Sequence, residues 1–213
     1  MPIRRLPVYI LLDTSGSMRG EPIHSVNVGL RAMFSALRQD PYALESVHLS
    51  IITFDIEPRE YLPLTPLDGV NIGEIQAPDS GATFLGAALE LLLQCVDRDL
   101  RRNTPEAKGD WRPLLFLMTD GSPSDLHAFR QAIPEVKRRD FGSIVACAAG
   151  PKARQDYLRE LTDRVVTLDT LDAAAFSGFF KWVSASVAVG SSSAGLADQV
   201  SLPPPPPEIQ LLP

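Results

Sequence analysis

The sequence has few cysteines and histidines, and this limits the kinds of site that it can build. Its 213 residues include two cysteines and three histidines. Cys95 and Cys147 each lie inside an apolar run, so we expect two buried thiols and neither a disulfide nor a metal-binding pair. The histidines are scattered; we expect structural roles for His24 and His48, and only His127 lies near a loop of interest. A zinc site built on cysteine and histidine is therefore not expected.

The sequence also lacks an excess of positive charge and long apolar runs. Its net charge is −6 and its pI is about 5.1, which argues against a nucleic-acid-binding surface. The basic cluster Lys137–Arg139 ends a predicted helix, where cations are favourable. We find no apolar run of the roughly 18 residues that span a bilayer, and Asp13 follows the first apolar run too soon for a signal peptide. We therefore expect a cytoplasmic protein that binds neither nucleic acid nor membrane.

Several catalytic motifs are missing as well. There is no G-x-S-x-G sequence and no P-loop. Asp13-Thr14 begins like the Asp-Thr/Ser-Gly motif of aspartic proteases, but Ser15 intervenes before the glycine. Ser15 also replaces the second aspartate in the D-x-D motif of aspartyl-phosphate phosphatases. We therefore assign no catalytic residue and expect a protein that is not an enzyme.

Apolar segments with strand and helix periodicity alternate along the chain. This alternation predicts an α/β fold with an open, doubly wound and mostly parallel sheet, one antiparallel edge strand and helices on both faces. The predicted strands are about 7–12, 47–54, 59–64, 113–118, 143–149 and 164–168, and the predicted helices are about 21–38, 87–100, 125–139, 152–162 and 171–189.

A change of composition after Val189 divides the chain into a domain, residues 1–189, and a tail, residues 190–213. The tail begins with a Ser/Gly-rich linker and continues with five prolines at 203–207, which favour a stiff extended conformation. Two interpretations remain open for the tail: a disordered segment, or a docking segment that lies on this domain or on a partner.

The loop after the first strand carries the pattern D-x-S-x-S in Asp13, Ser15 and Ser17. Their side chains occupy alternate positions, so they can point the same way. Carboxylate and hydroxyl oxygens are hard donors, which suit magnesium or manganese better than zinc. The alternative is a turn that caps the next helix, because serine, threonine and aspartate are common in both.

Two later loops have similar chemistry. Thr83 lies in Gly-Ala-Thr-Phe-Leu-Gly before a predicted helix, where it could serve instead as the helix cap. Asp120 lies in Thr-Asp-Gly directly after the predicted strand 113–118. Because Asp13 and Asp120 both follow strands, they face one crevice if the two strands are neighbours.

In this order, the three loops resemble the metal-ion-dependent adhesion site (MIDAS) of von Willebrand factor A domains, and the resemblance covers residues 7 to about 189. It implies the Rossmann-like fold of that family. It also implies a metal site formed by Asp13, Ser15, Ser17, Thr83 and Asp120, with Mg²⁺, or Mn²⁺ or Ca²⁺, as the ion. The segment 6–23 is most similar to the tellurium-resistance, TerY-type branch.

The resemblance implies a non-catalytic module that binds an acidic residue of a partner protein through the divalent cation. The TerY-type branch implies a bacterial tellurite- or stress-resistance signalling unit, with a PP2C-type phosphatase and a protein kinase as partners. The alternative function is a metal-dependent phosphohydrolase, in which a metal-bound water attacks a phosphate ester.

Overall fold

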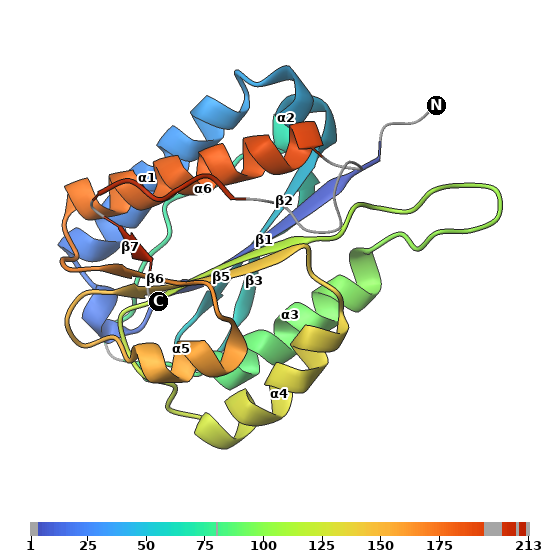
Figure 1. Ribbon diagram of the computed structural model, residues 1–213. Coiled ribbons are helices and arrows are strands. Elements are labelled where there is room, and N and C mark those ends of the chain that lie inside the picture. The colour runs from blue at the N-terminus through green and yellow to red at the C-terminus, as the bar shows by residue number, and fades with distance from the viewer. Residues whose placement is uncertain (1–3, 80, 194–201, 208, 212–213) are drawn as a thin grey trace.

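A seven-stranded sheet forms the centre of the computed structural model, which describes residues 4–79, 81–193, 202–207 and 209–211 (Figure 1). The strand order is β3-β2-β1-β4-β5-β6-β7, and β1, β2, β4, β5 and β6 are parallel. The predicted fold class is confirmed, including β3 as an antiparallel edge strand. The strands are β1 Leu6–Asp13, β2 Val47–Phe54, β3 Arg59–Pro66, β4 Leu114–Thr119, β5 Ser143–Ala149, β6 Val165–Leu168 and β7 Gln210–Leu211.

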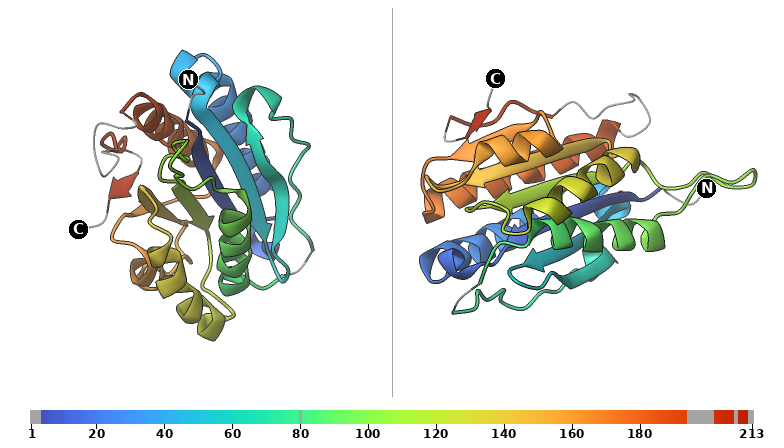
Figure 2. Two further views of the ribbon diagram at one scale, coloured as in Figure 1. Left: turned by 90° about the vertical axis from the view of Figure 1, so that its right-hand side faces the viewer. Right: turned by 90° about the horizontal axis from the view of Figure 1, so that it is seen from below.

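Helices cover both faces of the sheet, as Figures 1 and 2 show. The alternating side chains of the buried strand β1 explain this: Val8 and Ile10 pack in one apolar cluster, and Tyr9 and Leu11 pack in another. The first cluster is completed by α1 Glu21–Leu37, α2 Pro41–Ser46 and α6 Ala173–Ser193, and the second by α3 Leu85–Asp99, α4 Leu126–Arg138 and α5 Gln155–Leu161.

Two helical features differ from the prediction. The short helix α2 was not predicted; Asp40 caps it by accepting hydrogen bonds from the backbone N–H groups of Tyr42 and Ala43. Helix α6 continues to Ser193, so residues 190–193 of the expected linker are helical. Residues 194–201, 208 and 212–213 of the predicted tail lie outside the described residues.

The expectation of no membrane-length apolar segment is wrong for α6. Residues 173–192 are long and apolar enough to cross a bilayer by length and composition, and half of them are buried. The apolar surface of this helix packs on α1, where a Cβ atom on Gly29 would lie 2.3 Å from the Phe180 ring. Packing in the domain core thus accounts for the apolar composition of α6.

The described part of the tail lies against the domain. The indole N–H of Trp182 in α6 donates a 2.9 Å hydrogen bond to the carbonyl of Pro203. Ile209 is buried, and β7 pairs antiparallel with β6. This second antiparallel edge strand was not predicted, because two residues are too few for a periodic pattern. Both cysteines are free and buried, as expected.

Candidate metal centre

The predicted site residues meet at the carboxyl ends of β1 and β4. These strands are parallel neighbours, and the chain leaves them toward opposite sides of the sheet, to β2 and to β5. In open α/β sheets, ligands bind in the crevice at such a reversal of strand order. Asp13 is the last residue of β1, and Asp120 directly follows β4.

Asp13 is fully buried and connects the two strand ends. Its Oδ1 accepts a hydrogen bond of 2.8 Å from the backbone N–H of Ser15, and its Oδ2 accepts one of 2.5 Å from the hydroxyl of Thr119. Burial raises the pKa of Asp13 to about 6 despite these hydrogen bonds, and the nearby charge of Asp120 adds to the increase.

The short 3₁₀ turn Gly16–Met18 brings both serine hydroxyls to the same place. Ser17 Oγ donates a hydrogen bond of 2.9 Å to Asp120 Oδ1, and it lies 3.2 Å from Ser15 Oγ. Burial raises the pKa of Asp120, while the hydrogen bond from Ser17 and the charge of Lys152 oppose this shift. Four of the five predicted ligands are therefore joined by direct hydrogen bonds.

Thr83 lies against the Asp120 loop. Its N–H donates to Ser124 Oγ at 3.1 Å, and its carbonyl accepts from the Ser124 N–H at 2.8 Å. A Cβ atom on Gly121 would lie 3.0 Å from Thr83 Oγ1, so the glycine leaves room for this hydroxyl. Helix α3 begins at Leu85 after the N-cap Phe84, so the alternative capping role of Thr83 is not found.

Asp125, which was assigned no role from the sequence, stabilises the N-terminus of α3 instead. Its carboxylate accepts hydrogen bonds of 3.0 and 2.8 Å from the N–H groups of Gly86 and Ala87. Gly86 is required here, because a Cβ atom would lie 2.3 Å from the backbone nitrogen of Phe129. Thr119 and Ser124 were missed as well. The sequence signal was the string of polar residues from Thr119, at the end of β4, to Asp125, of which only Asp120 was given a role.

The donor set fits a hard divalent cation. It consists of two carboxylates and three neutral hydroxyls, and in the described part of the chain no three His, Cys, Asp or Glu side chains cluster as a metal site. Within the same residues, neither Asp13 nor Asp120 forms an ion pair, although both are buried. Two buried carboxylates without a cationic partner are costly, and a divalent cation bound by oxygen ligands offsets this cost.

An acidic hollow of about 700 Å³ adjoins this site. Its lining includes Thr14, which follows Asp13, three acidic side chains, Asp55, Glu57 and Glu74, and one basic side chain, Arg59. Asp55 also touches the Thr83 loop, because its carbonyl accepts a hydrogen bond of 2.9 Å from the N–H of Phe84. This hollow is therefore negative on balance, which favours a cation bound beside it.

Solved structures with the same fold come from several organisms. The pilus adhesin SpaC from Lactobacillus rhamnosus GG matches 89% of this chain over 31% of its own, with 11% identity and a TM-score of 0.70. A von Willebrand factor type A protein from Catenulispora acidiphila matches 87% of this chain over 43% of its own (17% identity, TM-score 0.59). Proximal thread matrix protein 1 of the mussel byssus was solved with a zinc-occupied MIDAS motif. Its match covers 85% of this chain and 48% of the mussel chain, with 14% identity and a TM-score of 0.57.

This chain thus spans half or less of the length of these three proteins, and no curated protein sequence matches it significantly. The family comparison is direct, because the model of the von Willebrand factor type A domain matches residues 8–174. Domains of this family commonly mediate metal-dependent protein–protein interactions. The chain belongs to the von Willebrand factor type A domain family.

Proposed function

We propose that this chain is a non-catalytic protein-interaction module that uses a divalent cation to bind an acidic residue of a partner. Asp13, Ser15, Ser17, Thr83 and Asp120 hold the cation. The observation that carries the proposal is the meeting of two buried carboxylates and three hydroxyls at the carboxyl ends of β1 and β4, where neither carboxylate has an ion-pair partner among the described residues.

The chemistry of these residues favours an anionic partner. Hydroxyl ligands are neutral, so two carboxylates leave a divalent cation electron-poor and open to one more hard ligand. A glutamate or aspartate carboxylate is that ligand, since a neutral amide binds weakly and a cation is repelled. Asp13 has a further role: its hydrogen bonds to Ser15 and Thr119 orient the loop that presents the hydroxyls.

We propose Mg²⁺ as the cation, with Mn²⁺, Ca²⁺ and, because of the mussel protein, Zn²⁺ as the ions to compare. The proposed setting is a bacterial tellurite- or stress-resistance signalling unit in the cytoplasm, with a PP2C-type phosphatase and a protein kinase as candidate partners. The support for this setting is the likeness of residues 6–23 to the TerY-type branch.

Calorimetric titration with these four ions tests the site. We expect Asp13→Ala and Asp120→Ala to lose binding while circular dichroism shows an intact fold, because both residues lie at the ends of strands. Asp169→Ala is the matched control, since this exposed carboxylate follows β6 at the same end of the sheet. Undiminished binding by either site variant would overturn the assignment.

A pull-down with and without EDTA then tests the function. We expect capture of a partner that is lost with EDTA, with Asp120→Ala, and when one acidic residue of the partner is replaced by its amide. Hydrolysis of phosphate esters that requires both the metal and Asp120 would instead identify a metal-dependent phosphohydrolase.

A further inference from the structure

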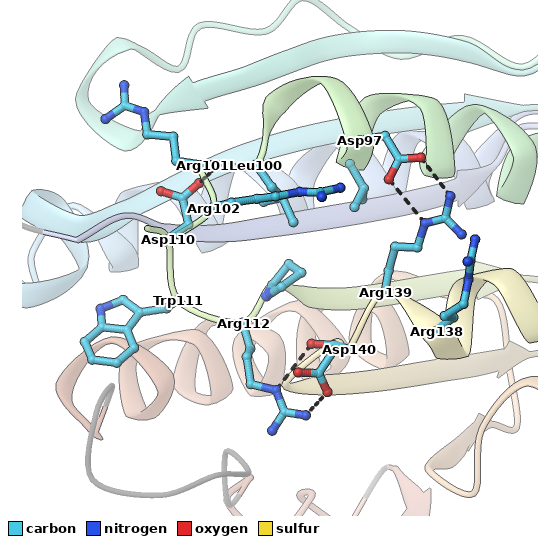
Figure 3. A pocket seen from close by; sticks show the side chains of 12 residues that line it. Asp97, Leu100, Arg101, Arg102, Asp110, Trp111, Arg112, Arg138, Arg139 and Asp140 are labelled. Atoms are coloured by element: carbon cyan, nitrogen blue, oxygen red, sulfur yellow. Dashed lines mark hydrogen bonds and ion pairs between the residues drawn. The ribbon is translucent and has the colours of Figure 1, made fainter. Parts of the chain in front are cut away.

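A second hollow, of about 680 Å³, lies at the opposite end of the sheet (Figure 3). The C-terminal ends of α3 and α4 and the long loop between α3 and β4 form it, and this loop projects from the domain in Figure 1. Its charged lining consists of three aspartates, Asp97, Asp110 and Asp140, and five arginines, Arg101, Arg102, Arg112, Arg138 and Arg139.

All three aspartates are already paired with arginines. The partner of Asp97 is Arg139, at 2.7 Å. Asp140 pairs with Arg112, and Asp110 pairs with Arg5, which lies outside the lining, at 2.6 Å. The carboxylates therefore do not neutralise the remaining arginines of the hollow.

Three arginines of the lining remain: Arg101, Arg102 and Arg138. Among the described residues, the guanidinium groups of Arg101 and Arg102 form no hydrogen bond or ion pair, and both side chains are exposed. Within the described residues, the one ion pair of Arg138 is an exposed pair with Glu135, and such surface pairs contribute little. Figure 3 shows the Arg102 side chain reaching into the hollow toward Asp97 and Arg139, while Arg101 points away from it.

The electrostatics around Asp97 confirm that several cations face the same space. The pKa of Asp97 is lowered chiefly by its hydrogen bond with Arg139, and further by the charges of Arg102 and Arg138. Three guanidinium groups thus act on a single carboxylate. The resulting positive charge is local, because the whole chain has a net charge of −6.

Helix capping explains only part of this cluster. Cations are favourable at helix C-termini, and Arg139 donates to the carbonyl of Glu135 and Arg112 to the carbonyl of Asp140. Arg101 and Arg102 make no such contact with their side chains within the part of the chain that the structure describes. Their charge is available to a ligand.

The hollow favours a phosphate group over a flat aromatic ligand. Arg4 already covers the ring of Trp111, with its guanidinium carbon 3.5 Å from the ring centroid. Val96, Leu100 and Pro113 supply an apolar floor, which strengthens the electrostatic attraction above it. The planar guanidinium group matches the geometry of phosphate oxygens. The charge of two unpaired arginines is balanced better by a dianionic phosphate than by a single carboxylate.

We propose that this hollow binds a phosphate monoester, with Arg102 as the main contact and Arg101 and Arg138 as supporting cations. The ester is either a small metabolite or a phosphorylated side chain of a protein, because both present the same dianion. The site is separate from the metal centre, since it lies at the amino ends of the parallel strands. Side chains of exposed arginines change rotamer rapidly, so Arg101 can turn toward a bound ligand.

NMR titration of the full chain tests this proposal with glycerol 3-phosphate and with a short phosphoserine peptide. We expect shifts of signals from 96–102, 110–113 and 138–140, and binding that weakens as salt increases. The unphosphorylated peptide should cause no such shifts. Saturation by glycerol 3-phosphate supports the metabolite, whereas saturation by the phosphopeptide alone supports the protein side chain.

Matched variants distinguish a site from general attraction. We expect Arg102→Gln to weaken binding at least tenfold, and Arg31→Gln, a change at an exposed arginine of α1, to leave it unchanged. Asp13→Ala should retain phosphate binding. The test of the phosphate site is therefore independent of whether the proposed metal site is correct. Equal weakening by Arg31→Gln, shifts outside the hollow, or no binding at millimolar phosphate would overturn the proposal.

Discussion

The carboxylates at the two ends of the sheet have opposite electrostatic surroundings. At the carboxyl ends of the strands, Asp13 and Asp120 are buried beside hydroxyl groups, and the pKa of each is raised. At the amino ends, Asp97 is close to three arginines, and its pKa is lowered. One end thus has two buried carboxylates without an ion-pair partner among the described residues, and the other has arginines left over after every carboxylate of the hollow is paired.

This difference follows the direction of the helices. In a parallel α/β sheet, helix N-termini gather at the carboxyl ends of the strands and helix C-termini gather at the amino ends. The partial positive charge of N-termini favours acidic side chains, and the partial negative charge of C-termini favours arginines. Charges that no ion pair of the described residues balances remain at both ends, Asp13 and Asp120 at one and Arg101 and Arg102 at the other, and we propose one ligand of opposite charge for each end.

The largest expected effect comes from removing one carboxylate at the acidic end. Asp120→Asn keeps the size of the side chain and an oxygen that can accept from Ser17, but it removes the charge. We expect the affinity for divalent cations to fall by about 100-fold or more, and Ser17→Ala to reduce it by about tenfold. Competition with a metal-binding dye measures both changes, and Asp169→Asn is the control that should bind as the wild type does.

Protonation of Asp13 gives the next largest effect, in the metal-free protein. A raised pKa means that the folded state binds this proton more tightly than the unfolded state does. The resulting stability is fully present below the usual pKa of 3.8 and is lost as the pH rises through about 6. This difference corresponds to about 3 kcal/mol.

We therefore expect the metal-free protein to become more stable between pH 7.5 and pH 5, relative to Asp13→Asn. Urea denaturation of both proteins in EDTA at several pH values measures the difference. With a saturating divalent cation the trend should reverse, because protons and the cation compete for the same carboxylate. A metal-free difference that does not depend on pH would contradict the raised pKa.

The sequence predicted the fold closely because its strands are buried on both faces. Mostly apolar runs such as Val47–Phe54 and Ser143–Ala149 mark such strands, and the structure has the same bounds. The two-residue strand β7 could not be predicted, since its pairing depends on long-range contacts of the tail with β6. The apolar length of α6 was also missed, because its small residues and single lysine interrupt the apolar pattern.

The meeting of Asp13 and Asp120 was predictable for a similar reason. Asp13 and Asp120 are marked by their positions directly after apolar strands, and the order of strands then brings them together. Thr119 acts through a hydrogen bond to Asp13, which lies 106 positions away in the sequence. Asp125 acts through hydrogen bonds to Gly86 and Ala87, which lie 39 and 38 positions away. Such partners depend on the final packing of the loops, which local sequence patterns do not contain.

A smaller effect on stability is expected from Asp125, which precedes the first residue of α4 and binds the N-terminus of α3. Asp125→Ala removes the acceptor of two N–H groups at the N-terminus of α3, which should reduce the free energy of unfolding by about 1–2 kcal/mol. Because Thr83 lies just before α3, metal affinity should fall as well, although less than in Asp120→Asn. Denaturation and metal titration measure the two effects, and Asp125→Asn, which keeps an acceptor oxygen, should lose less of each.

The smallest expected effect on stability lies at the arginine-rich end, where one substitution should lower the free energy of unfolding slightly and strengthen phosphate binding. Asp97→Asn weakens the pair with Arg139, which is half exposed on the carboxylate side, so the free energy of unfolding should change by less than about 1 kcal/mol.

The same change leaves Arg102, Arg138 and Arg139 facing a neutral side chain. We therefore expect tighter binding of glycerol 3-phosphate, by several-fold at low salt and less at high salt, because screening shortens the range of the added attraction. Metal binding at the other end should stay unchanged. Weaker phosphate binding in Asp97→Asn would show that Asp97 holds the arginines in place for the ligand and does not compete with it.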